Sequence, residues 1–216
     1  MTMNLNEPFV ITISREIGSG GHTVGDILAK RLNVRYCDND LIKSLESRFN
    51  LTVGGIEKIK GEKKNWLADL VKGCSPMPSA RILGINSRYT HEYYPGITTD
   101  DIYSAEKEIL QELAQEGSCV IAGRSGFHIF KDHPNRLNVF ITASENNRVK
   151  RVMKKQGMNE ADATTLVKSI DQARENYIKR YTDTSRYDAR NYDLVINMDA
   201  LPNEEAAVDV IMKFIG

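Results

Sequence analysis

Residues 9–23 read Phe-Val-Ile-Thr-Ile-Ser-Arg-Glu-Ile-Gly-Ser-Gly-Gly-His-Thr, and this stretch decides the fold. Residues 9–14 are β-branched and almost continuously apolar, which is typical of a strand buried on both faces. Three glycines come next, at positions 18, 20 and 21. Apolar residues then recur at helical spacing, at Val24, Ile27, Leu28 and Leu32. The opening therefore predicts a strand, a glycine turn and a helix.

The rest of the chain continues this alternation of strands and helices. Further strands are expected at 34–37, 119–122, 137–142 and 193–197. Helices are expected around 41–45, at 102–116, from the N-cap Ser144 to near Gly157, from about Asn159 to Arg180, and at 204–215. Such an order predicts an α/β fold, with a parallel sheet and helices on both of its faces.

Composition limits the classes of protein to consider. The 216 residues are 41% hydrophobic and 27% charged, which suits one globular domain. Lys plus Arg equals Asp plus Glu at 29 each, so no whole-surface attraction to nucleic acid or membrane is expected. The first residues lack the pattern of a secretory signal. Cys37, Cys74 and Cys119 are odd in number and widely spaced, which argues against a disulfide framework and predicts a cytoplasmic protein.

The glycine turn has the composition of a phosphate-binding loop. Unpaired amides at a helix N-terminus attract anions, and glycines let the backbone curl around them. We expect phosphate to bind Gly18, Ser19, Gly20, Gly21, His22 and Thr23, with the Thr23 hydroxyl as a ligand of Mg²⁺. The alternative is a tight turn in which the glycines only supply positive φ angles.

The turn departs from the usual GxxxxGK[ST] pattern, because no Gly-Lys-Ser or Gly-Lys-Thr occurs in the chain. With Thr23 on the hydroxyl position, Gly21 stands where the lysine would be. That lysine normally places a positive charge on the β- and γ-phosphates. Arg15, at the end of the first strand, is the nearest substitute, and a solvated strand-end charge is the alternative interpretation.

Six blocks of the sequence resemble the cytidylate kinase-like family, a P-loop branch related to bacterial cytidylate kinases. In chain order these blocks are 11–21, 36–42, 119–124, 139–143 with Arg148 and Arg151, 171–177 and 192–197. They occur in the family's order between residue 9 and about residue 200, whereas the segment from about 50 to 100 matches little. The lysine-less glycine turn is a feature of the family's less studied members.

The resemblance implies a three-layer P-loop NTPase-like fold. It also implies an enzyme that transfers the γ-phosphoryl group of ATP, with Mg²⁺, to a nucleoside monophosphate, with CMP and dCMP as the favoured acceptors. It implies a core of about 1–45, 100–150 and 190–216, a substrate-binding insertion of about 46–99 and a lid of about 151–189. ATP and a nucleoside monophosphate are then the partners, with no nucleic acid and no membrane, and a homo-oligomer remains open. Two alternatives stay open: a kinase of a different small substrate, and a nucleotide-binding regulatory protein without turnover.

Arginines are the candidate catalytic residues, since phosphoryl transfer needs positive charge around the moving group. By the resemblance, Arg124 faces the acceptor phosphate and Arg174 closes over the transferred group from the lid. Arg148 and Arg151 flank the start of the lid, where related kinases hold the adenine and the phosphates, so Arg148 is expected to contact the donor nucleotide. Arg180, Arg186 and Arg190 are further candidates. The alternatives are a structural salt bridge for Arg124, a surface pair of Arg174 with Asp171, and a solvated basic helix face around Arg148.

Asp38 and Asp40 follow the short second strand and are candidate substrate-binding residues. A carboxylate there can accept a ribose hydroxyl or hold magnesium through water. Capping of the next helix by Asp38 is the alternative.

Overall fold

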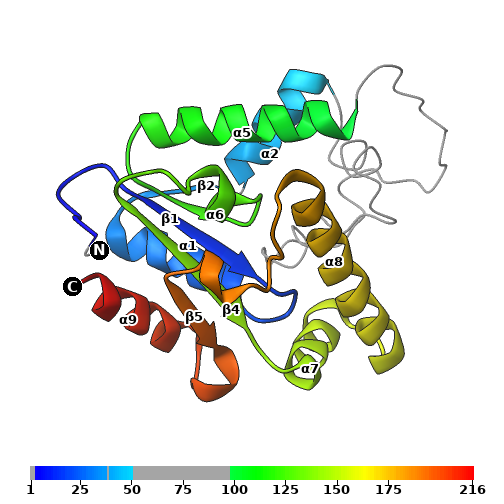
Figure 1. Ribbon diagram of the computed structural model, residues 1–216. Helices are drawn as coiled ribbons and strands as arrows, with labels where there is room; N and C mark the ends of the chain where they lie inside the picture. Colours follow the sequence, from blue (N-terminus) through cyan, green and yellow to red (C-terminus); the bar gives the residue numbers. More distant parts are fainter. Residues whose placement is uncertain (1–2, 38, 51–97) are drawn as a thin grey trace.

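The computed structural model describes residues 3–37, 39–50 and 98–216 (Figure 1). The strands are β1 Val10–Arg15, β2 Arg35–Cys37, β3 Cys119–Ala122, β4 Arg136–Thr142 and β5 Leu194–Asn197. The helices are α1 Gly21–Leu32, α2 Asn39–Phe49, α5 Thr99–Gln115, α6 Gly126–Ile129, α7 Glu145–Gln156, α8 Glu160–Tyr181 and α9 Glu204–Ile215. Short 3₁₀ turns lie at Ala189–Asn191 and Met198–Ala200.

The five strands form one parallel sheet in the order β2-β3-β1-β4-β5. The predicted α/β fold is therefore confirmed. The register places Ile13 beside Ala122 of β3 and Arg15 beside Ile141 of β4. The carboxyl ends of the three central strands thus meet at one edge, where ligands of such sheets bind.

Each face of the sheet buries its own core, because alternate residues of a strand point to opposite faces. Ile11 and Ile13 belong to a cluster with apolar residues of α1 and α9. Val10 and Ile121 belong to another cluster, with residues of α2 and α5. All four side chains are fully buried. The near-continuous apolar character of residues 9–14 follows from this burial on both sides.

Local capping sets the helix boundaries. Ser144 caps α7 as the sequence predicts, by accepting a hydrogen bond from the Asn147 N–H, and Asn159 caps α8 in the same way. Helix α5 begins at Thr99 rather than at 102, because Thr98 and Asp101 form a reciprocal capping box. The four-residue helix α6 was not expected from the sequence.

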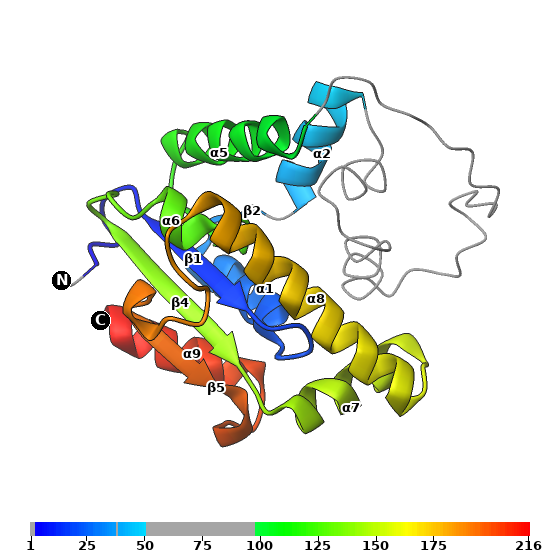
Figure 2. The same cartoon turned by 45° about the vertical axis from the view of Figure 1, so that its right-hand side comes forward.

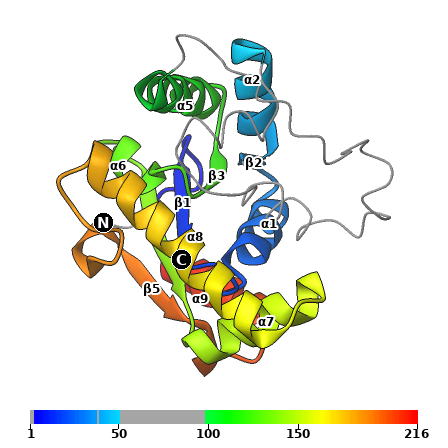
Figure 3. The same ribbon diagram turned by 90° about the vertical axis from the view of Figure 1, so that its right-hand side faces the viewer.

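Helices α7 and α8 pack over the carboxyl edge of the sheet. Ile17, from the glycine turn, is buried with apolar side chains of both helices: Val149, Val152, Ala163, Val167 and Ile170. Figure 2 and Figure 3 show α8 crossing in front of the strand ends, with α7 beside it. Among the described residues, no helix is long and apolar enough to cross a membrane.

Candidate active site

The glycine turn joins β1 to α1 at the edge where the strands end. Gly18 and Gly20 have φ angles of 78° and 89°, a left-handed conformation that favours glycine. A Cβ atom at Gly18 would lie 2.6 Å from the carbonyl oxygen of Arg148, and one at Gly20 would lie 2.3 Å from Nη1 of Arg151. The backbone conformation therefore favours glycine at both positions, and the Arg148 backbone leaves no room for a Cβ atom at Gly18.

Helix α1 begins with neither a capping side chain at its N-cap nor an acidic residue in its first turn. Its N-cap is Gly20, which has no side chain to accept from the first amides. Helices α5, α7, α8 and α9, in contrast, each have a side-chain cap and an acidic first turn. The positive end of the α1 dipole is thus left open to an anion.

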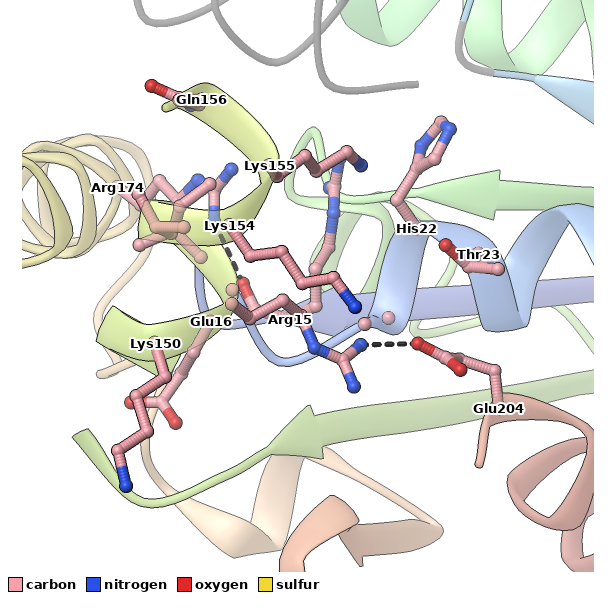
Figure 4. Close-up of a pocket in the computed structure, with 16 residues that line it drawn as sticks. Arg15, Glu16, His22, Thr23, Lys150, Lys154, Lys155, Gln156, Arg174 and Glu204 are labelled. Atoms are coloured by element: carbon pink, nitrogen blue, oxygen red, sulfur yellow. Dashed lines mark hydrogen bonds and ion pairs between the residues drawn. The ribbon is translucent and has the colours of Figure 1, made fainter. Parts of the chain in front are cut away.

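A cavity of about 480 Å³ lies against this turn. Gly18, Gly20, Gly21, His22 and Thr23 form one wall, and residues of α7 form the opposite wall. Figure 4 shows Lys154 reaching from α7 across the cavity toward the turn, and it shows Thr23 on the first turn of α1. The basic face of α7 is exposed, as the sequence suggests, but part of it forms this wall. We name this space the donor cavity.

Ser19 is the one residue of the expected phosphate loop that does not line the donor cavity. Its side chain is buried, and its hydroxyl donates to the carbonyl of Glu16. The hydroxyl also lies 3.4 Å from the Gly21 N–H. In this conformation Ser19 stabilises the turn from within.

Arg15 is buried, with 7% of its surface exposed, so it is not the solvated strand-end charge of the alternative interpretation. Its Nη1 would lie 2.0 Å from a Cβ atom at Gly123, so the guanidinium rests directly on that glycine. Its Nε has no hydrogen-bond partner among the described residues. Its carbonyl oxygen accepts from the guanidinium groups of Arg174 and Arg186.

A second, smaller cavity of about 60 Å³ lies beyond Arg15, and we name it the arginine cavity. Four arginines line it, together with Tyr177 and the turn after β3: Arg15, Arg124, Arg174 and Arg186. Gly123, Arg124 and Ser125 have φ angles of 71°, 58° and 57°. Left-handed conformations outside glycine are costly and gather at functional sites. The three residues of this turn line the arginine cavity.

Glu106 of α5 fixes two groups of the arginine cavity. Its carboxylate is fully buried and lies 3.1 Å from Nη1 of Arg124, so the salt bridge considered for Arg124 is present. The Tyr177 hydroxyl donates to the other carboxylate oxygen. Burial and the neighbouring charge of Glu106 raise the pKa of Tyr177 well above its ordinary value. Tyr177 therefore stays a neutral hydrogen-bond donor.

Asp171 of α8 ties helices α7 and α8 to the glycine turn. Its carboxylate accepts from the Ile17 N–H at 3.1 Å and lies 2.5 Å from Nη1 of Arg148. Arg174 and Arg186 are 3.7 Å and 3.5 Å from it. Arg148 also donates to the carbonyl of Ile17 and does not line the donor cavity. A contact of Arg148 with a nucleotide thus stays a prediction.

The remaining candidates lie elsewhere. Arg180 pairs with Asp100 and Arg190 with Asp188 on the exposed surface, and neither arginine lines one of these two cavities. Asp38 lies outside the described residues, and for Asp40 only its place in α2 is described. Within the described ranges, no cluster of three or more His, Cys, Asp or Glu side chains could hold a metal ion.

Sequence reasoning missed the carboxylates at this edge. Glu106 sits in a helix about 70 residues from Tyr177, its partner, and Glu204 begins a helix at the far end of the chain. Glu106 falls on the apolar stripe of α5, and an acidic residue on such a stripe was the available signal. Glu204 carries no signal of its own, because acidic residues are common in first helical turns.

Residues 10–200 match the cytidylate kinase-like family, and the chain belongs to this family. A solved structure of an uncharacterized protein from Eubacterium ventriosum is similar over 96% of this chain and 98% of its own, with TM-score 0.66 and 24% identity. A shikimate kinase from Bacteroides thetaiotaomicron is similar over 96% and 98%, with TM-score 0.55 and 18% identity. The fold is thus that of the P-loop kinases.

A curated relative, uronate isomerase from Corynebacterium glutamicum, is 31% identical over 107 residues, which is half of this chain. The chain spans about a fifth of that protein's length. This likeness covers too little of the relative to assign a whole-protein activity.

Proposed function

We propose that the protein is a phosphotransferase that moves the γ-phosphoryl group of ATP to a nucleoside monophosphate. One observation carries the proposal: Arg15 and Arg174 line both the donor cavity and the arginine cavity. A donor phosphate at the glycine turn and an acceptor in the arginine cavity would meet at these two side chains. Phosphoryl transfer depends on such positioning and on positive charge at the transferred group.

The chemistry of the arginine cavity favours an acceptor that carries a phosphate. Guanidinium groups pair with phosphate in a planar, bidentate way and stay charged. Arg15, Arg124, Arg174 and Arg186 bring four positive charges, against the carboxylates of Glu106 and Asp171. A neutral polyol would leave part of this buried charge without a counter-ion, whereas a phosphate monoester supplies one. CMP and dCMP are the acceptors that family membership favours.

Magnesium and ATP fit the residues of the donor cavity. The turn exposes its backbone at Gly18 and Gly20, and neither glycine carries a side chain that would keep a phosphate away. Thr23, on the first turn of α1, offers a hydroxyl to a cation that takes its other ligands from phosphate and water. Bound there, Mg²⁺ would neutralise charge on the phosphates. The chain itself contributes the turn amides, the cations of α7 and the shared arginines.

A coupled assay with Mg²⁺-ATP and CMP, dCMP, UMP or AMP tests the proposal. We expect turnover with one of the cytidine nucleotides, and a large loss in the Arg124→Ala and Arg174→Ala variants. Turnover only with a non-nucleotide acceptor would favour a kinase of another small substrate. ATP binding without turnover of any acceptor would favour a regulatory protein.

The same proposal assigns roles to two segments of the chain, the lid and the insertion. In this proposal α7 and α8 are the start and body of the lid at about 151–189, and the insertion at about 46–99 takes part in binding the acceptor. Residues 51–97 lie outside the described part of the chain. Deletion of the insertion should change the preference among monophosphates while ATP binding persists, which calorimetry and the coupled assay measure together.

A further inference from the structure

An ion pair lies on the glycine turn where the donor phosphates are expected. Arg151 of α7 and Glu204, the first residue of α9, are bonded to each other through Nη1 and Oε1. Measured from a Cβ atom placed on Gly20, the Arg151 Nη1 would be 2.3 Å away and the Glu204 Oε1 3.0 Å away. Both side chains line the donor cavity, and Figure 4 shows the Glu204 carboxylate pointing into it, joined to its partner by a dashed line.

The chemistry of this position suits an anion better than a cation. Gly20 is the N-cap of α1, whose first amides and dipole favour negative charge. A guanidinium alone would be repelled there, and the Glu204 carboxylate offsets that repulsion. The pair is partly exposed, with 40% of the Arg151 side chain and 23% of the Glu204 side chain accessible. It is therefore within reach of a ligand that enters the cavity.

The backbone that carries Arg151 is held against the turn. The carbonyl oxygen of Arg148, one helical turn earlier, is packed on Gly18, and the Arg148 side chain bonds the Ile17 carbonyl. Arg151 can thus exchange one anionic partner for another by a side-chain movement. Arg15, the substitute suggested by the sequence, instead rests its guanidinium on Gly123, toward the arginine cavity.

We propose that the Glu204 carboxylate occupies the place of a donor phosphate, and that ATP binds by displacing it from Arg151. Arg151 then supplies the positive charge that the lysine-less turn lacks, and Glu204 holds that charge in place until the donor arrives. Glu204 also lowers the affinity for polyphosphate, because it competes for the same guanidinium. This inference rests on the proposed function, since it assumes that the donor cavity receives ATP.

Calorimetric titration of the intact chain with ATP, in EDTA and again in excess Mg²⁺, tests the inference. We expect Glu204→Gln to tighten ATP binding several-fold in both conditions. Arg151→Ala should weaken it by roughly ten- to a hundred-fold, the range for a lost hydrogen bond to a charged group. Arg151→Lys should recover part of the loss, and Lys154→Ala should cost less than Arg151→Ala.

Asp209→Asn is the matched control. Asp209 lies on the same helix as Glu204 and pairs with Arg31 at the other end of α1, so its removal changes the charge of α9 without touching the cavity. Its ATP affinity should equal that of the wild type. Thermal unfolding of each variant shows that the fold is retained.

The outcomes separate the inference from the function on which it rests. No ATP binding by the wild-type chain would overturn the proposed function, and the inference with it. Normal binding that neither Arg151→Ala nor Glu204→Gln changes would overturn the inference alone. Weaker binding of Glu204→Gln in Mg²⁺ only would make Glu204 a cation ligand, and a larger loss in Lys154→Ala than in Arg151→Ala would move the required charge to Lys154. Both of these results also contradict the inference.

Discussion

At the scale of single residues, Gly20 combines a left-handed backbone conformation with close neighbours. Its φ angle is 89°, and a Cβ atom would meet Arg151 at 2.3 Å. Gly157, which ends α7, has a φ angle of 67° but nothing within 4 Å of a Cβ atom. Alanine substitutions at the two positions therefore distinguish the effect of the backbone conformation on stability from the effect of a blocked cavity on binding.

We predict that Gly20→Ala and Gly157→Ala each lose about 1–2 kcal/mol of unfolding free energy, the cost of a left-handed conformation outside glycine. Only Gly20→Ala should also lose ATP binding, because its methyl group enters the donor cavity. Urea unfolding and calorimetry measure the two effects. Equal loss of ATP binding in both variants would mean that the glycine turn is not the binding site.

Tyr192 gives a prediction for alkaline pH. Burial raises its pKa from 10.0 to about 12, and its hydroxyl donates to the Arg186 carbonyl at 2.7 Å. Between these two pH values the unfolded chain loses the proton and the folded chain keeps it. The contribution of Tyr192 to stability is therefore complete below pH 10 and is lost as the pH rises toward 12.

The Tyr192→Phe variant tests whether Tyr192 lowers the stability as the pH rises. Two pKa units correspond to about 3 kcal/mol, so the unfolding free energy of the wild type should fall by that order relative to Tyr192→Phe across this range. Urea unfolding at successive pH values gives the difference. Parallel curves for the two proteins would show that Tyr192 titrates normally in the fold.

At the scale of elements, buried ion pairs join α7 and α8 to the glycine turn. An exposed ion pair also joins the two helices to each other. Asp171 is buried, and its carboxylate contacts three arginines and the Ile17 amide. Glu145 and Lys168 link the same two helices at 3.2 Å, with 51% and 63% of their side chains exposed. Burial decides which of these ion pairs is essential, since a surface pair is screened by water.

We predict that Asp171→Asn costs about 3–5 kcal/mol, because it leaves buried guanidinium groups without their counter-ion. Hydrogen exchange should rise first in α7 and α8, whose hold on the turn is weakened. Glu145→Gln, the matched control between the same helices, should cost less than about 1 kcal/mol. Similar losses of unfolding free energy in both variants, or hydrogen exchange that rises evenly over the sheet, would show that Asp171 does not hold α7 and α8 against the turn.

At the scale of the whole molecule, the sheet is stable because both faces are covered. Ile211 of α9 is fully buried in the cluster that contains Ile11 and Ile13. Its neighbour Val210 points outward, with 39% of its surface exposed. Of these two consecutive residues, one therefore lies in the core and the other on the surface.

We predict that Ile211→Ala lowers the unfolding free energy by about 2–5 kcal/mol through a cavity at the sheet face. Val210→Ala should stay within about 0.5 kcal/mol of the wild type. Chemical unfolding followed by fluorescence and circular dichroism measures both changes. A loss in Val210→Ala as large as that in Ile211→Ala would mean that another surface covers α9 in solution.

The sequence by itself determined the fold class, the order of the elements and the position of the glycine turn. These depend on local patterns: the apolar run at 9–14, the glycines at 18, 20 and 21, and caps such as Ser144. Short-range sterics and the burial of alternate residues dictate them, so they are readable along the chain. Family membership follows from the same blocks.

Only the tertiary structure decided where the charges go. Arg15 turns toward Gly123 rather than along the glycine turn, and Arg151 meets Glu204 from the far end of the chain. Such pairings depend on packing between helices that are more than 50 residues apart, and the exposed or buried state of a charge is settled only there. The arrangement of arginines around two cavities is a property of the assembled edge of the sheet.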